Sequence, residues 1–556
     1  MTATATLPSA RRLRIDGWAL LACAVAIPVT LPVLVVLSHV FAPFGEVWEH
    51  LASTVLPRYV ANTVWLMLGV GVGVLTIGVS TAWLVTMCRF PGRRFFEWAL
   101  LLPIAMPAYV IAYTYTGLLD VPGPVQTWLR ATFHLTHQDY WFPPIRSLGG
   151  AIAMLTLVLY PYVYLLARAA FLNQSVAALE VSRTLGRGAW HSFLHVALPL
   201  ARPGIAAGLA LVLMEVLNDF GTVQFFAVDT FSTGIYRTWL ALGSPTAAAQ
   251  LSAILMLFIF AVLALERWSR GTARFHHGPT RYQRLPSYPL TGARRAGAVL
   301  ACALPPAIGF GIPVSALLKW TVEGPSGFAD ARFLRFAGNS LVLATVAAAL
   351  VVALALAVAY GLRLRPSRFG VFAARLASTG YAVPGSVVAV GVLLPFGWFD
   401  NALDAWTRAN LGVSTGLLLS GTIAAVIFAY LVRFFAVAFN SVEAGFAKVT
   451  GNMEAAARML GRGPLSTLAR VHLPLIWSSV LTASMLVFVD VMKELPATLM
   501  IRPFNFDTLA IRVYELVGDE QLRAASAPAL MIVLVGLMPV IVLSRGIARS
   551  RPGHDV

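Results

Sequence analysis

The chain has 556 residues, of which 58% are hydrophobic and only 12% are charged. This composition excludes both an ordinary soluble domain and a disordered chain, and it indicates a protein that spans a membrane many times. The 41 lysines and arginines outnumber the 24 acidic residues and give a net charge of +17, so a nucleic-acid partner has to be considered as well.

Long apolar segments recur along the whole chain. A helix needs about 20 apolar residues to cross a bilayer, and about twelve segments qualify, so we predict an all-α polytopic membrane protein. The first follows Arg11, Arg12 and Arg14 but is too long for a secretion signal, so we expect it to be retained as a helix. The predicted spans lie near 17–42, 61–88, 96–119, 148–172, 203–226, 247–266, 294–318, 338–362, 371–396, 414–440, 477–500 and 525–547.

The basic residues cluster in every second connection and at both ends of the chain, whereas the alternate connections hold far fewer. Membrane proteins keep lysine and arginine on the cytoplasmic side, so this distribution predicts that both termini are cytoplasmic. An even number of spans requires the same. The excess of positive charge is therefore explained by the orientation of the chain in the membrane, and we expect no nucleic-acid partner.

Residues far apart in the sequence repeat at a constant offset. Gly186 and Gly461 are 461 − 186 = 275 positions apart, and Pro199 and Pro474 are separated by the same distance. A fixed offset over a long stretch indicates a duplicated unit. We expect two halves of parallel topology, related by a pseudo-two-fold axis along the membrane normal, which suits a transport pathway between them. The predicted parts are a cytoplasmic tail 1–16, a first half 17–266, a cytoplasmic linker 267–293, a second half 294–547 and a cytoplasmic tail 548–556.

One proline in each half, Pro107 and Pro384, falls inside a predicted span. Proline removes a backbone hydrogen bond from a helix, so we expect a kink or a break at both positions. Non-helical backbone is tolerated in a membrane where it faces protein or a water-filled cavity.

Each half also carries a polar segment in which a short helix stops at a glycine, Gly186 or Gly461. A late proline, Pro199 or Pro474, precedes the next apolar span. Glycine permits the left-handed turn that ends such a helix, and its apolar side chains suit a groove on a partner protein.

The spans that follow these segments carry acids: Glu215 and Asp219 in the first half, Asp490 and Glu494 in the second. An i, i+4 spacing predicts that each pair shares one helix face. Charges facing lipid are costly, so all four should face the interior and one another. They either line a route for a hard cation or form a structural or gating network with neighbours such as Lys493. We expect no tightly bound metal.

The polar segments resemble the EAA loops of ATP-binding-cassette importer permeases, in which Glu-Ala-Ala, Gly and a late Leu-Pro form the helices that dock on ATPase subunits. Here Glu180 and Glu454 precede the glycines, but Val181-Ser182 replaces Ala-Ala in the first copy. The chain has no phosphate-binding loop of the Gly-x-x-x-x-Gly-Lys-Ser/Thr type. The resemblance therefore implies a non-enzymatic chain without its own cofactor. ATP and Mg²⁺ would bind to a homodimeric ATP-binding subunit on the cytoplasmic side.

Nearly the whole chain resembles fused two-half permeases of the ferric iron transport family. The resemblance implies a type I importer permease fold in a prokaryotic inner membrane and an extracytoplasmic solute-binding protein that delivers Fe³⁺. Arg237 and Arg512 would then face that protein, unless they are solvated surface residues, and the four acids would contact the cation transiently. Thiamine or aminoethylphosphonate import, an ion-coupled secondary transporter and a channel are the alternatives. The matching stretches are Asn218–Gln224, Gly234–Trp239, Met492–Thr498 and Arg502–Ala510.

Overall fold

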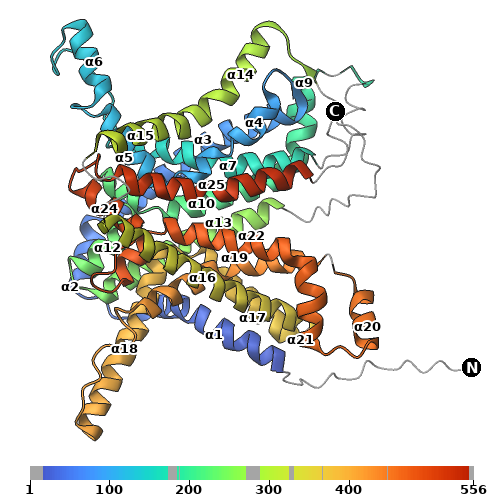
Figure 1. Cartoon of the computed structure of the whole chain (residues 1–556). Coiled ribbons are helices and arrows are strands. Elements are labelled where there is room, and N and C mark those ends of the chain that lie inside the picture. Colours follow the sequence, from blue (N-terminus) through green and yellow to red (C-terminus); the bar gives the residue numbers. More distant parts are fainter. Residues whose placement is uncertain are drawn as a thin grey trace, which may run out of the picture.

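A computed structural model of the chain describes residues 17–172, 184–186, 188–270, 288–324, 331–365, 367–447 and 449–549. The predicted tail 1–16, residues 550–556 of the predicted tail 548–556 and most of the predicted linker 267–293 lie outside these residues. The described chain forms a bundle of helices with a single pair of two-residue strands (Figure 1). The predicted all-α fold is confirmed.

The first half contains long membrane helices joined by short helices at their ends. Its elements are α1 (Gly17–Ser38), η1 (His39–Phe41), α2 (Glu46–Thr54), α3 (Leu56–Met87), β1 (Cys88–Arg89), α4 (Arg93–Ala99), η2 (Leu102–Ala105), α5 (Ala108–Leu119), α6 (Pro124–Phe133), α7 (Leu148–Leu172), α9 (Ala189–Ser192), η3 (Phe193–Ala197), α10 (Leu198–Asn218), α11 (Gly221–Phe225), α12 (Phe231–Leu240) and α13 (Pro245–Arg270).

The second half repeats this order. Its elements are β2 (Tyr288–Pro289), α14 (Gly292–Pro306), η4 (Ala307–Gly311), α15 (Ile312–Glu323), α16 (Ala331–Leu364), α17 (Arg368–Ala377), η5 (Ser378–Ala382), α18 (Gly385–Leu411), α19 (Ile423–Phe446), α20 (Gly451–Met459), α21 (Pro464–Thr467), η6 (Leu468–His472), α22 (Leu473–Lys493), α23 (Pro496–Ile501), α24 (Leu509–Gly518) and α25 (Ser526–Arg549).

The repetition extends to irregular details. The π-helical turns η3 and η6 precede α10 and α22 and start 468 − 193 = 275 residues apart. The short helices α11 and α23 start at the same offset, 496 − 221 = 275. Irregular turns of this kind are kept where they aim side chains at a functional position, so the repeat preserves one geometry in both halves.

Ten helices among the described residues are long and apolar enough to cross a membrane, and one bent pair, Arg93–Ala105 with Ala108–Phe133, adds an eleventh span. The apolar start of α25, Ser526–Ile541, falls just below that length. Together these segments account for the prediction of about twelve spans.

The predicted helix breaks occur at both prolines. The bent pair turns by 91° at Met106 and Pro107, where Pro107 has an extended ψ of 142° and begins α5. Pro384 has a ψ of 147° and begins α18 in the same way. Proline cannot donate to the preceding turn. The break at Met106 and Pro107 lines a cavity between the halves, where non-helical backbone is tolerated.

The halves interlock through their first helices. Helix α1 packs against α16, α17 and α18 of the second half, while α14, η4 and α15 pack against α3, α5, α7 and η2 of the first. The last helices cross over as well, since α13 contacts α18 and α25 contacts η2. Each half thus supplies packing contacts to the other half, and both halves enclose the space between them.

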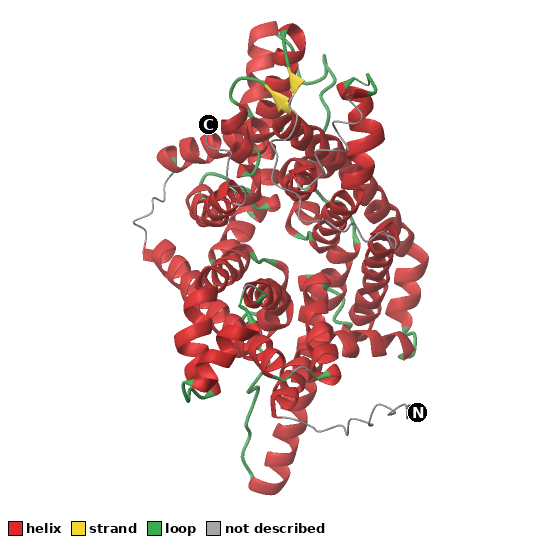
Figure 2. Ribbon diagram, turned by 90° about the vertical axis from the view of Figure 1, so that its right-hand side faces the viewer, coloured by secondary structure: helices red, strands yellow, loops and turns green. Residues whose placement is uncertain are grey.

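The short elements separate by side. In Figure 1, α9, α20 and α21 lie at the right-hand end of the bundle, and α2, α6, α12 and α24 lie at the left-hand end. Seen from the right-hand end, many of the long helices are viewed nearly along their axes around the centre of the molecule (Figure 2). The described part of the first polar segment, at α9, and the second polar segment, at α20 and α21, therefore lie at the same end of the bundle.

Candidate functional site

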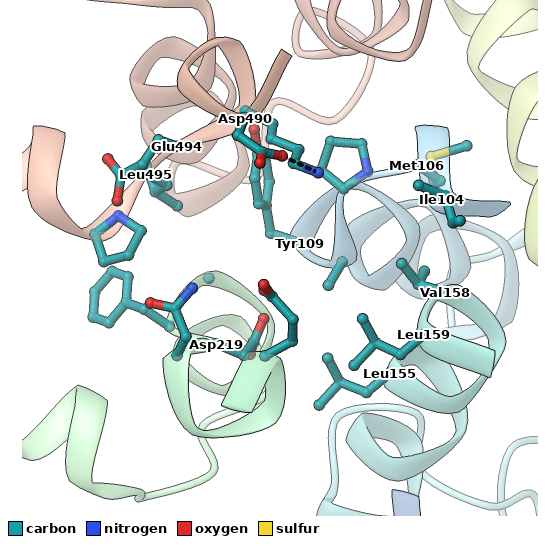
Figure 3. A pocket seen from close by; sticks show the side chains of 18 of the residues that line it. Ile104, Met106, Tyr109, Leu155, Val158, Leu159, Asp219, Asp490, Glu494 and Leu495 are labelled. Carbon is teal, nitrogen blue, oxygen red and sulfur yellow. Dashed lines mark ion pairs between the residues drawn. The ribbon is translucent and has the colours of Figure 1, made fainter. Parts of the chain in front are cut away.

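The candidate site is a cavity of about 120 Å³ where the break at Met106 and Pro107 meets the ends of α10 and α22. Both halves line it, and all four predicted acids lie on its wall (Figure 3). Tyrosines from three helices contribute hydroxyl groups. The polar and charged lining residues are Tyr109, Tyr162, Glu215, Asn218, Asp219, Tyr381, Arg433, Asp490, Lys493 and Glu494.

The two acids of each pair do not lie on one continuous helix, so this prediction was wrong. Helix α10 ends at Asn218 and α22 ends at Lys493, and the next residues, Asp219 and Glu494, adopt extended ψ angles of 129° and 125°. A short helix begins two residues further on. The reason is that these acids accept hydrogen bonds from the short helices, which competes with continuing the long ones.

Asp219 holds the start of α11. Its carboxylate accepts a bond from the Thr222 hydroxyl at 2.9 Å and from the Val223 amide at 3.1 Å. The positive end of a helix dipole favours a carboxylate at this position.

Glu494 plays the same part for α23 and is more deeply enclosed. Its oxygens accept bonds from the amides of Ala497 and Thr498, both at 3.0 Å, and from the Thr498 hydroxyl. The Arg433 guanidinium donates a further bond at 2.9 Å, and the Glu494 side chain is only 1% exposed. This acid is a structural element of the second half.

Arg433 was not among the predicted site residues. The sequence could have indicated this residue, however, because it is the single arginine in the largely apolar helix α19, Ile423–Phe446. A charge at such a depth is costly and requires a partner, which here is Glu494. The corresponding position of the first half, 433 − 275 = 158, is Val158, so Asp219 has no such partner.

The first acid of each pair, Glu215 or Asp490, lines the cavity, but the two acids have different partners. Asp490 forms an ion pair with Lys493 of the same helix at 2.9 Å, as the sequence suggested. The equivalent of Lys493 is Asn218, whose side-chain oxygen instead accepts the Gly385 amide at the start of α18. Among the described residues, the Glu215 carboxylate accepts a single hydrogen bond, from the Tyr381 hydroxyl at 3.5 Å.

The wall of the cavity is therefore electrically asymmetric. Asp490 and Glu494 in the second half each have a cationic partner, whereas Glu215 and Asp219 have none within 4.0 Å among the described residues. Four carboxylates against one lysine and one arginine leave a formal −4 + 2 = −2. The unbalanced charge lies on the first-half wall.

Such a wall attracts a cation without fixing it. In the part of the chain that the structure describes, no group of three or more His, Cys, Asp or Glu side chains is arranged to hold a metal ion. The nearest oxygens are carboxylates and tyrosine hydroxyls, which suit hard cations. The arrangement thus supports passing contact with a cation.

The polar segments show the predicted glycine turns. Gly186 and Gly461 have φ angles of +73° and +72°, in the left-handed region. After α20, the Gly461 amide donates a hydrogen bond to the Arg458 carbonyl, and the Arg462 amide donates one to the Ala457 carbonyl. These bonds satisfy the carbonyl groups at the helix end. Pro199 and Pro474 are the second residues of α10 and α22, as expected for a helix start. Glu180 lies outside the described residues.

Glu454 faces the membrane helices. The guanidinium of Arg363, in the last turn of α16, binds it at 2.5 Å and also donates to the carbonyl groups of Phe446 and Val449. The opposite surface of the segment exposes apolar side chains, with Met459 89% and Leu460 79% exposed. Glu454 therefore anchors α20 to α16 and leaves the apolar surface open.

The two arginines predicted to meet a binding protein both have partners within the chain. Arg237 pairs with Asp229 at 2.5 Å, and Arg512 lies 3.4 Å from Glu515 and over the Phe336 ring. Their role in docking stays a prediction.

Comparison with known proteins agrees with this geometry. The family model described as "Binding-protein-dependent transport system inner membrane component" matches residues 74–270. The chain is 28% identical over 533 residues to the Fe(3+)-transport system permease protein FbpB 2 of Haemophilus influenzae, covering 95% of this chain and 97% of that protein.

Two further relatives show how widely the match extends. The putative ferric transport system permease protein FbpB 1 of the same organism is 24% identical over 85% of this chain and 74% of its own length. The sulfate transport system permease protein CysT of Escherichia coli is 31% identical over 34% of this chain and 69% of its own length. The chain therefore belongs to the family of binding-protein-dependent transport system inner membrane components, the permease subunits of ATP-binding-cassette importers.

Proposed function

We propose that this permease imports ferric iron through the cavity between its two halves. Two relatives that match most of the chain carry ferric iron transport in their names, whereas the sulfate permease matches only about a third of it. The observation that carries the proposal is the unpaired negative charge of Glu215 and Asp219 on the first-half wall.

This charge suits the proposed substrate. Fe³⁺ is a hard cation that prefers oxygen ligands, and Glu215 lies beside the hydroxyl groups of Tyr162 and Tyr381 on the same wall. An anion such as sulfate would be repelled there. Because Asp219 also holds α11, only Glu215 is free to follow a moving ion, which allows release into the cytoplasm.

Energy would come from separate subunits. We infer that α20 and its first-half counterpart each dock on one copy of a homodimeric ATP-binding subunit, which binds ATP and Mg²⁺. The exposed Leu185, Met459 and Leu460 supply the apolar contacts, and Gly186 and Gly461 shape them. In this arrangement both termini are cytoplasmic, and a solute-binding protein docks at the opposite end, near Arg237 and Arg512.

Uptake by the assembled complex tests the cation route. With the ATP-binding subunit and the binding protein in proteoliposomes, Glu215→Gln should lower radioactive iron uptake roughly tenfold, because one charged contact is lost, while ATP hydrolysis continues. Glu323→Gln is the matched control, since Glu323 is 44% exposed and lies outside the cavity. Equal uptake by Glu215→Gln and the unmodified chain would remove Glu215 from the route.

Substrate identity is tested on the binding protein. Binding of ferric iron, thiamine and aminoethylphosphonate to the purified binding protein should show iron as the ligand. Exclusive binding of either organic ligand would overturn the iron proposal and leave the permease assignment intact. If the chain transports with a proton or ion gradient and without any ATP-binding subunit, it is a secondary transporter instead.

A further inference from the structure

A second cavity of about 310 Å³ lies beneath α20, and it shares no lining residue with the cavity between the halves. Its wall is formed by the last turns of α16, the start of α1 and the segment from α20 to η6. It therefore lies where the ATPase-facing segment of the second half meets the membrane helices, at the right-hand end of Figure 1.

A buried histidine in this wall makes no hydrogen bond in the described chain. His472 is fully buried at 0% exposure, lines the cavity, and neither of its ring nitrogens makes a hydrogen bond within the described chain. The nearest carboxylate oxygen, Oε1 of Glu454, is 3.5 Å away and is already bound by Arg363. Buried polar atoms nearly always have a hydrogen-bond partner. The two ring nitrogens of His472, which have none in the described chain, therefore indicate a ligand inside the cavity.

The rest of the wall favours an anionic partner. Three arginines, Arg365, Arg458 and Arg462, line the cavity against the single carboxylate of Glu454, which leaves a formal 3 − 1 = +2. The Nε of Arg458 donates to the Glu454 carbonyl at 3.5 Å, while its Nη2 reaches only to 3.9 Å from the Glu454 carboxylate, so its terminal donors make no hydrogen bond in the described chain. Guanidinium groups bind phosphate oxygens with paired hydrogen bonds.

The buried histidine has no histidine counterpart in the first half. The position that corresponds to His472 is 472 − 275 = 197, an alanine. In the first half, the Trp83 ring lies near two other aromatic rings, with centroid distances of 4.8 Å to Phe193 and 5.6 Å to Phe171. The buried histidine is therefore a feature of the second half and is not required by the repeat.

We propose that this cavity binds a phosphate group, supplied by the headgroup of an anionic phospholipid of the cytoplasmic leaflet. Trp18 and Tyr360 form part of the wall, and such residues mark the membrane–water boundary. Basic pockets between membrane helices on this side attract anionic headgroups. The bound group would bridge α20 to α16 and strengthen the contact that Arg363 and Glu454 already make. Free phosphate is the other source of the same chemistry.

Binding to the purified full-length chain tests the site independently of transport. Native mass spectrometry should show tighter binding of phosphatidylglycerol than of phosphatidylcholine, which lacks the net charge. Arg458→Gln with Arg462→Gln should weaken phosphatidylglycerol binding by about tenfold or more, since charge-assisted bonds are lost. The control pair Arg368→Gln and Arg470→Gln makes the same change of charge at exposed positions outside the cavity and should leave binding intact.

A separate titration identifies the source of the phosphate group. Inorganic phosphate that binds by calorimetry, displaces the lipid and depends on Arg458 and Arg462 supports the site and makes the free ion a ligand. Arg458→Lys with Arg462→Lys keeps the charge and should retain part of the affinity, which separates binding from loss of folding. Equal lipid and phosphate binding by the unmodified chain and the glutamine pair would overturn the proposal.

Discussion

Replacing Arg433 with methionine should destabilise the permease more than any surface ion-pair change. Glu494, at 1% exposure, would keep three of its four hydrogen bonds, those from Ala497 and Thr498, but would lose the only cation within 4.0 Å in the described chain. Breaking a buried pair by removing one partner costs about 3–5 kcal/mol. Because Glu494 keeps the hydrogen bonds from Ala497 and Thr498, the expected loss of unfolding free energy is near the lower end of this range, about 3 kcal/mol.

A double-mutant cycle in mixed micelles measures this interaction. The free energy of unfolding is compared for Arg433→Met, Glu494→Gln and the double variant, and an interaction of about 2 kcal/mol is expected because the double variant leaves no buried charge. Arg408→Met is the control, since its pair with Asp404 is 63% exposed on the arginine side and should change stability by less than about 1 kcal/mol. An Arg433→Met variant as stable as that control would refute the structural role of the pair.

Three further changes test the geometry. Tryptophan at both Gly186 and Gly461 should uncouple ATP hydrolysis from uptake in proteoliposomes, because the surface that meets the ATPase changes, while alanine adds only about 1–2 kcal/mol of backbone strain at each site. Gly385→Ala should cost about 1–3 kcal/mol of unfolding free energy, since its Cβ would lie 2.7 Å from Glu494 Oε1. Lys493→Met should slow iron release in single-turnover uptake, because Asp490 would lose its only partner in the described chain.

Each of these has an outcome that would contradict it. Coupled uptake in the double tryptophan variant would remove the glycine segments from ATPase docking. Gly338→Ala, with open space around its Cβ, is the control for Gly385→Ala, and equal stability of the two would show that the Arg433–Glu494 pair tolerates displacement. Unchanged release by Lys493→Met would mean that Asp490 does not meet the ion.

Composition and the repeat predicted most of the architecture correctly. The spacing of apolar runs gave about twelve spans, and the constant offset gave two halves with the same helix order, because both follow from local hydrophobicity and from duplication. Pro107 and Pro384 marked the broken helices, since proline cannot continue the hydrogen-bond ladder in any context. The glycine turns at Gly186 and Gly461 were equally local.

The distribution of charge in the site required the tertiary structure. The sequence placed four acids symmetrically, at Glu215, Asp219, Asp490 and Glu494, and it could not show that helices α10 and α22 end before the second acid of each pair. That end depends on bonds to the next short helix, and the neutralisation of Glu494 depends on Arg433, which is 61 residues away along the chain. The same holds for the packing of each first helix on the opposite half.

The sequence by itself determined the class of protein, the approximate number and order of its spans, the position of the helix breaks and the two polar segments with glycine turns. These depend on properties of single residues and on a periodic pattern. Only the tertiary structure decided which acids are paired, that Glu215 and Asp219 on the first-half wall have no cationic partner among the described residues, and that a cavity with a basic wall lies under α20. Those features depend on contacts between residues that are distant in the chain. A few substitutions are enough to make such contacts differ between two related halves.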